Sequence, residues 1–209
     1  MPVRQRTETR LLDAADELLF THGVTATPVD AILERAGVSP ATLYRAYGSK
    51  EGLVAATLDR RQREWLEVWD EAVAQAPDDV SRLLAVFDAL DYFQVRPHAA
   101  RWCAFLGTAA EYAEAPPVLA AAIRRDTDDL RTRLTALAEP LVGPGAAELA
   151  EQVLLVFSGH LAMRLRSVGP TDTSVARKIA RRIAEAVVGL SPPATAPPPP
   201  TRRPPSPRR

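Results

Sequence analysis

Small and hydroxyl-bearing side chains follow the turn residue Gly37 in the stretch VSPATLYRAY. Thr42 can offer a hydroxyl or a methyl group to base edges, and Tyr44 can offer its hydroxyl to a phosphate or its ring edge to a thymine methyl. Ala41 lets a helix approach closely without a clash. Lys50, at another helix start, adds a positive charge where backbone N–H groups already favour a phosphate. A core helix would carry Leu and Ile at the positions after the turn. The pattern therefore predicts a short helix whose outer face lies in a groove of double-stranded DNA.

Three helix starts and one glycine turn position these side chains. Thr27 and Ser39 suit N-caps, and each is followed by a proline, which is tolerated at the first helical position. Gly37 suits the left-handed residue that ends the helix between them. Ser49 suits a third N-cap. This punctuation predicts a helix-turn-helix motif at about residues 27–47.

The stretch AILERAGVSPATLYRAYGSKEGL resembles the DNA-binding segment of the tetracycline-repressor (TetR) family of bacterial regulators, and TRLLDAADELLFTHGV resembles that family's first helix. The resemblance implies that the residues after the turn glycine enter the major groove and that Arg45 and Lys50 contact phosphates. Tyr47 stands where the family usually has Phe, and Ala46 stands where many members carry His. The expected DNA-contact residues are Thr27, Ser39, Pro40, Ala41, Thr42, Tyr44, Arg45, Tyr47 and Lys50.

The composition favours a helical protein of two domains. The 209 residues include 6% aromatics and many Ala-rich runs, without the alternation of β-branched residues that is typical of strands. We expect an all-α fold with a three-helix helix-turn-helix head at 4–64 and a helical ligand-binding and dimerisation domain at 65–190. The tail at 191–209 is rich in Pro and Arg and cannot form a core, so we expect it to be disordered. Its four Arg leave residues 1–190 with a net charge of −4.

The sequence lacks the features of disulfide-stabilised, secreted and membrane-spanning proteins and the motifs of several enzyme classes. Cys103 is the only cysteine, which excludes an intrachain disulfide. The first residues lack the apolar segment of a signal peptide, and the longest apolar runs are far shorter than the ~20 residues of a membrane span. The sequence contains no HExxH, CxxC or phosphate-binding Gly-rich motif. We expect a cytoplasmic protein with no cofactor, no metal and no membrane partner.

Helix boundaries in the second domain follow the prolines and glycines. A long connector helix is predicted from Ser49 to about Gln75, and the next helix runs from about Asp78 to Gln94. Further helices are predicted near 100–113, 117–139, 146–166 and 172–189, with a loop at 143–145.

The last two predicted helices each carry an apolar stripe. In the resembled family this pair forms a four-helix interface with a second subunit, so the resemblance implies a homodimer. Two recognition helices would then bind the half-sites of a palindromic operator about one turn, ~34 Å, apart. The alternative is that both stripes form only intrachain core. The candidate dimer-interface residues are Val153, Val156, Leu161, Val175, Ile179, Ile183 and Val187.

Between the connector and the last helices lie the larger side chains that are candidates for an effector pocket. Apolar walls with a few polar groups suit a small, mostly hydrophobic ligand. Any of these residues could instead be ordinary core, and His160 and Cys103 in particular could be simply buried. The candidates are Trp69, Phe87, Leu90, Phe93, Trp102, Cys103, Phe105, Leu106, Tyr112, Leu130, Phe157 and His160.

Three functions remain in competition at this point. The first is a transcriptional regulator, acting as a repressor, that binds an operator as a dimer and is released by a small-molecule effector. The second is a helical enzyme using Cys103 with a histidine, which would need the thiol and a base within hydrogen-bond reach. The third is a DNA-binding protein that responds to no ligand, which a large second domain disfavours.

Overall fold

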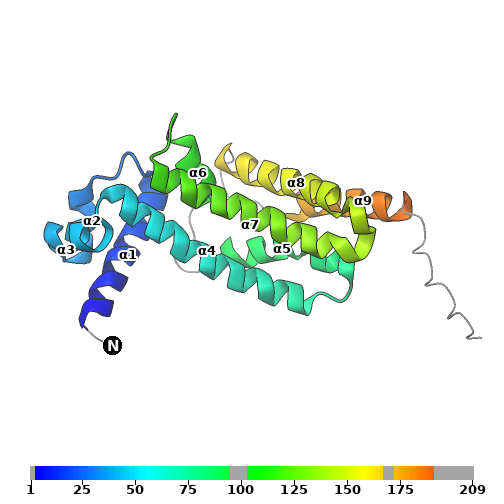
Figure 1. The fold of residues 1–209 in the computed structure, drawn as a ribbon, viewed down its shortest axis with the longest axis horizontal. Helices are drawn as coiled ribbons and strands as arrows, with labels where there is room; N and C mark the ends of the chain where they lie inside the picture. Colours follow the sequence, from blue (N-terminus) through cyan, green and yellow to red (C-terminus); the bar gives the residue numbers. More distant parts are fainter. Residues whose placement is uncertain (1–2, 95–102, 167–171, 191–209) are drawn as a thin grey trace, which may run out of the picture.

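The computed structural model describes residues 3–94, 103–166 and 172–190, and those residues form helices without any strand. The molecule is elongated, with α1 to α3 at one end and α4 running from them into the remaining helices (Figure 1). The all-α fold expected from the sequence is confirmed. The helices are α1 (Val3–His22), α2 (Val29–Ala36), α3 (Pro40–Tyr47), α4 (Lys50–Gln75), α5 (Asp79–Gln94), α6 (Ala104–Ala110), α7 (Pro117–Val142), α8 (Ala146–Arg166) and α9 (Ser174–Leu190).

The punctuation around α3 forms as predicted. Gly37 ends α2 with a φ of 62°, and the Val38 N–H donates to the Leu33 carbonyl, which closes the turn. Ser39 occupies the N-cap position of α3, with Pro40 at the first helical position. Ser49 caps α4 by accepting a hydrogen bond from the Gly52 N–H. The helix-turn-helix motif is therefore confirmed.

The predicted cap at Thr27 is wrong. The residue before α2 is Pro28, in an extended conformation, and α2 has no side-chain cap. Thr27 is only 3% exposed, and its hydroxyl donates to the carbonyls of Leu18 and Gly23. A β-branched hydroxyl can bond back to a nearby carbonyl as well as cap a helix, and here the loop after α1 provides that alternative.

The connector α4 and the following α5 agree with the predicted ranges, as does α8. Helix α6 is shorter than the predicted 100–113, although residues 95–102 lie outside the described part of the chain. Helix α7 continues past the predicted end at 139, with Pro140 inside its last turn, and residues 143–145 form a 3-10 turn instead of an open loop. Proline removes one helical N–H donor, and only two residues follow it before the helix ends.

Two apolar cores lie along the molecule, and α4 contributes to both. The head core joins α1 to α3 and the first two turns of α4, through residues such as Leu19, Ile32 and Leu53. It also includes Ala104 of α6 and Leu119 of α7. The body core begins at Trp65 of α4 and extends over α5, α7, α8 and α9. The head is therefore packed against α6 and the start of α7, and not only joined to the body through α4.

Residues 117–166 contain an 18-residue window whose mean hydropathy of 1.2 would suit a membrane-crossing helix. This stretch is not one helix, because the 3-10 turn at 143–145 divides it into α7 and α8, which lie side by side (Figure 1). A core helix passes the same test of length and composition. The window is thus weak evidence for a membrane span. The tail at 191–209, expected to be disordered, lies outside the described residues.

Candidate DNA-binding surface and body cavity

Helix α3 has one buried side and one exposed side. Leu43 is completely buried in the head core and fixes the orientation of the helix. On the other side, Tyr44 is 53% exposed, and Ala41 and Arg45 are also exposed. Helix α3 also lies at the far end of the molecule, away from the body (Figure 1). The outer face of α3 is thus available to a partner as large as a DNA duplex.

The two hydroxyls at the start of α3 interact with each other. Ser39 is exposed and Thr42 is half-buried, and their side-chain oxygens lie 3.0 Å apart. This contact holds the Thr42 side chain at the surface of the helix start. Pro40 is exposed beside them.

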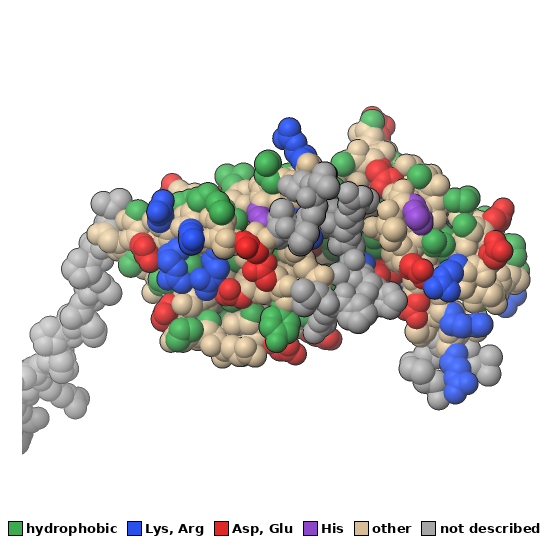
Figure 2. Space-filling view, turned by 180° about the vertical axis from the view of Figure 1, so that it is seen from behind, with side chains coloured by type: hydrophobic (Ala, Val, Ile, Leu, Met, Phe, Trp, Pro, Cys, Tyr) green, Lys and Arg blue, Asp and Glu red, His purple; other side chains and the backbone are tan. Residues whose placement is uncertain are grey.

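Cations gather near the turn and at the start of α1. Among the described residues, Arg6, Arg10 and Arg45 make no ion pair, whereas Arg35 is bound to Glu17 at 2.8 Å. Arg10 reaches the helix-turn-helix motif, because its Nη1 would lie 3.8 Å from a β-carbon placed on Gly37. Figure 2 shows blue side chains along the α1 end of the head, at the lower right. These free guanidinium groups are suited to neutralising phosphates.

Three of the sequence candidates do not point freely outward. Thr27 is buried, so the prediction that it contacts DNA is wrong. Tyr47 is half-buried against the head core, and burial raises the pKa of its phenol. Lys50 donates to the carbonyl of Val24 in the loop after α1, so one of its three N–H groups is already used within the head.

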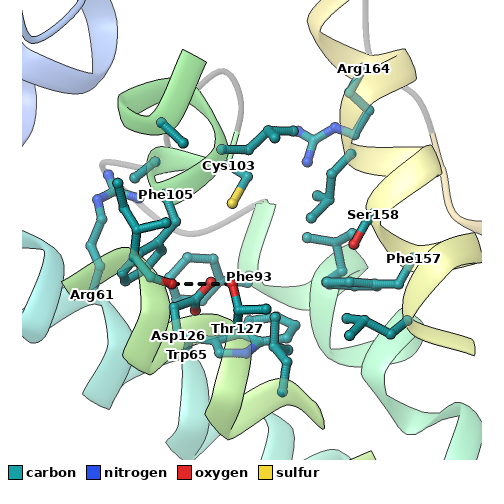
Figure 3. Close-up of a pocket in the computed structure, with 18 of the residues that line it drawn as sticks. Arg61, Trp65, Phe93, Cys103, Phe105, Asp126, Thr127, Phe157, Ser158 and Arg164 are labelled. Carbon is teal, nitrogen blue, oxygen red and sulfur yellow. Dashed lines mark hydrogen bonds between the residues drawn. The ribbon is translucent and has the colours of Figure 1, made fainter. Parts of the chain in front are cut away.

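A cavity of about 300 Å³ lies in the body between α4, α5, α6, α7 and α8 (Figure 3). Several residues named from the sequence form its walls. They are Leu90, Phe93, Cys103, Phe105, Leu106, Leu130 and Phe157.

Four other candidates are not part of the cavity wall. Trp69 and Phe87 are completely buried within the body core, where the Trp69 ring packs at a tilt against the Trp65 ring, with 5.9 Å between centroids. Tyr112 packs against the head core, and His160 lies outside the cavity. These four assignments were wrong because size and apolarity do not reveal which side of a helix faces a hollow. Trp102 lies outside the described residues.

The sequence analysis missed the polar side chains of the cavity. Arg61 lies in its wall and donates to both carboxylate oxygens of Asp16 on α1, at 2.6 and 2.9 Å. The Arg61 guanidinium also sits 4.8 Å from the centroid of the Phe20 ring. The other polar residues of the wall are Gln94, Asp126, Thr127, Ser158 and Arg164. The only hint in the sequence was that Arg61 and Asp126 lie on helix faces shared with apolar residues.

Burial shifts the pKa of three groups in the cavity wall, and it lowers that of the Arg164 guanidinium. It raises the pKa of the Asp126 carboxyl to about 7, and the neighbouring Asp129 charge adds to that rise. Burial likewise raises the pKa of the Cys103 thiol to about 11, again with a contribution from Asp126. A thiol with such a pKa stays protonated near neutral pH and is a poor nucleophile. The surroundings of Cys103 therefore disfavour its use as the nucleophile of an enzyme.

Helix α6 touches the cavity and the head at the same time. Cys103, Phe105 and Leu106 line the cavity, while Glu111, just after α6, reaches the loop that follows α1. The Glu111 carboxylate accepts hydrogen bonds from the Val24 N–H, the Thr25 N–H and the Thr25 hydroxyl, at 2.9, 2.7 and 2.8 Å.

Gly23 makes room for this contact. Its φ is +99°, and a β-carbon there would come within 3.3 Å of the Glu111 carboxylate. We refer to the three hydrogen bonds of Glu111 as the Glu111 clasp.

The candidate dimer residues fall on different sides of α8 and α9. Val175 and Ile179 of α9 are 67% and 46% exposed, as an interface before assembly would require. Val153 and Leu161 are buried inside the body, so their assignment to an interface is wrong. The remaining candidates pack partly against the body core. They are Val156, Ile183 and Val187.

The apolar stripe of α9 faces solvent at its start and the body core at its end, and helix geometry explains this change. An α-helix turns about 100° per residue, so residues four apart shift by about 40° each time. From Val175 to Val187 the stripe therefore turns by about 120°, from the solvent side to the body core. On α8 the exposed apolar residues are Leu155, Met163 and Leu165. Figure 2 shows green side chains along the upper left edge, where α8 and α9 lie.

Comparison with known proteins connects this architecture to gene regulation. Residues 11–57 match the family described as bacterial regulatory proteins, tetR family. The HTH-type transcriptional regulator BetI of Rhizobium meliloti is 33% identical over 170 residues, covering 79% of this chain and 80% of that protein. BetI of Burkholderia cenocepacia is 29% identical over 182 residues, covering 85% of this chain and 92% of the relative.

A solved structure has the same fold. A TetR-family transcriptional regulator from Streptomyces coelicolor superposes with a TM-score of 0.73 at 24% identity, covering 88% of this chain and 95% of that one. The relatives and the matched family are transcriptional regulators, and the residues that match the family include the helix-turn-helix motif with its exposed helix α3. The chain belongs to the tetR family of bacterial regulatory proteins and is a DNA-binding transcriptional regulator.

Proposed function

We propose that this regulator is a repressor that dissociates from its operator when a small, mostly apolar effector fills the body cavity. The observation that carries the proposal is the double role of α6, which lines the cavity with Cys103 and Phe105 and leads into the Glu111 clasp on the head. A ligand that moves α6 would alter the position of the head directly.

A second connection runs through α4. Arg61 lies in the cavity wall and is paired with Asp16 of α1, and both side chains are only 8% exposed. A ligand that displaces Arg61 would weaken a buried pair at the base of the head. Such coupling between two sites amounts to about 1–3 kcal/mol in known allosteric proteins, a 5- to 150-fold change in affinity.

On the DNA side, we propose contacts from the exposed face of α3 and from the free cations beside it. Tyr44, Thr42 and Ala41 would face the bases, while Arg45 and the arginines of α1 would face phosphates. Ser39 and Pro40 flank this face, and Lys50 retains two N–H donors for a phosphate. Tyr47 would serve mainly to fix α3 on the head core.

The experiment is fluorescence anisotropy with DNA taken from upstream of the protein's own gene, at two salt concentrations. Tyr44→Ala should weaken binding by about 10-fold, because it removes a base-edge contact worth about 1–3 kcal/mol. Arg45→Ala should reduce the salt dependence by about one phosphate contact. Arg63→Ala, an exposed arginine on α4, is the matched control and should bind like the wild type. Equal affinity of all four proteins would contradict the assignment of α3.

The proposed assembly is a homodimer through α8 and α9, since one short recognition helix contacts too few base pairs for a specific site. Leu155, Met163, Val175 and Ile179 form the exposed apolar surface that a second copy would cover. Sedimentation velocity should find a dimer for the wild type and a monomer for Leu155→Asp combined with Val175→Asp. Val118→Asp, at an exposed apolar residue of α7, should stay dimeric. A monomeric wild type that still binds a palindrome tightly would overturn this arrangement.

A further inference from the structure

The walls of the body cavity are aromatic and aliphatic, with few charges. Trp65 lies at the centre of an aromatic group, 5.7 Å from the Phe93 ring and 6.0 Å from the Phe157 ring, measured between centroids. Phe105 adds a fourth ring from α6. The charged groups of the wall are Arg61, Asp126 and Arg164. The chemistry of these three groups decides which ligand the cavity can hold.

Arg61 is already neutralised by the paired hydrogen bonds to Asp16. Arg164, on α8, makes no hydrogen bond or ion pair to any described residue, and Figure 3 shows it across the pocket from Asp126 and Trp65. The two arginines therefore do not form a pair with Asp126.

Like Arg164 and the Nε2 atom of Gln94, the Asp126 carboxylate has bonding capacity left over, and it is the only acidic group of the cavity wall. No described side chain or backbone N–H bonds to its carboxylate. The neighbouring Thr127 hydroxyl donates to the Ile123 carbonyl, at 3.1 Å, and not to Asp126 (Figure 3). From the facing elements, Arg61 of α4 is held by Asp16, Arg164 of α8 lies across the cavity, and Cys103 at the start of α6 is a neutral thiol. On α7 itself, Asp129 repels a second negative charge.

A carboxylate among aromatic rings is costly without a cation or hydrogen-bond donors. In the empty cavity the cost is reduced by proton uptake, in agreement with the raised pKa of about 7. A bound cation would remove the need for that proton. The aromatic rings that line the same cavity would add to the attraction, because the faces of Trp and Phe rings attract ammonium groups.

We propose that the effector is a small apolar amine, with its ammonium group on the Asp126 carboxylate and its apolar part against Trp65, Phe93 and Phe157. This inference rests on the proposed role of the cavity as the effector site and specifies the chemical class of its ligand. The volume of about 300 Å³ suits a molecule with one ring and a short chain.

The test uses three probes with the same apolar body and different charge: 4-phenylbutylamine, 4-phenylbutan-1-ol and 4-phenylbutyrate. Isothermal titration calorimetry with the full-length protein at pH 8 should give the amine at least 10-fold higher affinity than the alcohol. Asp126→Asn should abolish that preference and leave the affinity for the alcohol within 2-fold. Asp128→Asn removes the same charge from an exposed position of α7 and should retain the preference.

The pH dependence provides a second readout on the same proteins. Because the amine requires the ionised carboxylate, its affinity should rise as the pH increases from 5.5 to about 7 and level off above that value. Binding at pH 6 should release a proton, which calorimetry in two buffers of different ionisation enthalpy detects. The alcohol should show neither effect, and Asp126→Asn should lose both for the amine.

Several results would overturn the proposal. They are an amine that binds no better than the alcohol, no binding by any of the three probes, or tightest binding by the butyrate with loss on Arg164→Ala. Operator release, measured in parallel, separates this failure from failure of the proposed function. If the alcohol or the butyrate releases the operator, effector control stands and the amine class is wrong. If the amine binds through Asp126 without changing operator affinity, the ligand class stands and the effector role is wrong.

Discussion

The head and the body cavity treat their buried polar groups in opposite ways. In the head, the Asp16 carboxylate is paired with Arg61 of α4, the Thr27 hydroxyl bonds to two carbonyls, and the loop after α1 is bonded by both oxygens of the Glu111 carboxylate. In the cavity, Asp126 has no partner among the described residues. The difference indicates that the head is complete as it stands, whereas the cavity has a polar group that a ligand would satisfy.

The comparison also extends to the apolar packing. The head core has Leu43 and Leu53 at zero exposure and is closed from outside by α6 and the start of α7. The body core is interrupted by the cavity, whose walls include half-buried rings such as Phe93 and Phe105. A closely packed head attached to a body with an internal cavity is a suitable arrangement for transmitting a change at one site to the other. The following changes test this contrast, from the largest expected effect to the smallest.

Arg61→Ala should cause the largest loss of stability. It leaves the Asp16 carboxylate buried without its partner, and breaking one side of a buried pair costs about 3–5 kcal/mol. Urea unfolding followed by circular dichroism measures the loss. Arg125→Ala is the control, because its pair with Asp59 is exposed and contributes at most about 1 kcal/mol. Equal losses of unfolding free energy in the two variants would mean that the buried Arg61–Asp16 pair contributes no more than an exposed ion pair.

Asp126→Asn should instead raise the free energy of unfolding, by an amount that depends on pH. The folded-state pKa of Asp126 is about 7 and the ordinary value is 3.8, so the folded protein holds a proton that the unfolded chain releases. The wild type therefore loses stability as the pH rises from about 4 to about 7, and the loss is complete above that range. A shift of about three pKa units corresponds to about 4 kcal/mol.

The measurement is the difference in unfolding free energy between Asp126→Asn and the wild type at pH 5, 6, 7 and 8. The difference should grow in favour of the variant up to about pH 7 and then stay constant. A difference that is independent of pH would show that Asp126 is satisfied in the empty protein.

Cys103 should react slowly with a thiol reagent while the protein is folded. Raising its pKa from 9.0 to about 11 lowers the thiolate fraction at pH 8 by about 100-fold relative to the unfolded chain. Iodoacetamide labelling with and without 8 M urea, followed by mass spectrometry, measures both rates. Similar rates in the two conditions would indicate that the cavity wall opens readily.

Glu111→Ala should have the mildest effect on stability and a clear effect on communication. It removes the acceptor of three hydrogen bonds at a partly exposed site, with an expected loss of about 1–3 kcal/mol. Effector binding should then change operator affinity less than in the wild type. Glu114→Ala, three residues further along and exposed, is the control. Undiminished coupling in Glu111→Ala would assign the transmission to α4 alone.

Much of the head could be predicted from the sequence because local chemistry determines it. Gly37, Pro40 and Ser49 fix the turn and the helix starts through their own backbone preferences, whatever the rest of the chain does. The same reasoning failed for Thr27, because its hydroxyl donates to the nearby Gly23 carbonyl instead of capping α2. Tyr44 was expected on the outer face of the helix after the turn, and it is 53% exposed.

The cavity could be predicted only in part, because tertiary packing determines it. Phe93 and Phe157 were found by their size, but Trp69 and Phe87 have the same character and lie in solid core. Arg61 and Asp126 resemble ordinary surface charges in the sequence. They become interior groups only because α4, α6 and α7 meet between the two cores. Val153 and Leu161 of α8 were assigned to an interface for a similar reason, since the sequence does not specify which side of an apolar helix packs inside the subunit.

The coupling of the cavity to the head can be tested without any ligand, by filling the cavity with a side chain. Ala109 lies in the cavity wall on α6, so Ala109→Phe places a ring where an effector would sit, while Ala113→Phe adds the same ring at an exposed position. Operator affinity measured by fluorescence anisotropy should fall by about 5- to 150-fold for Ala109→Phe and stay unchanged for Ala113→Phe, with both proteins folded by circular dichroism. If folded Ala109→Phe binds the operator as tightly as the wild type, the cavity does not control the head.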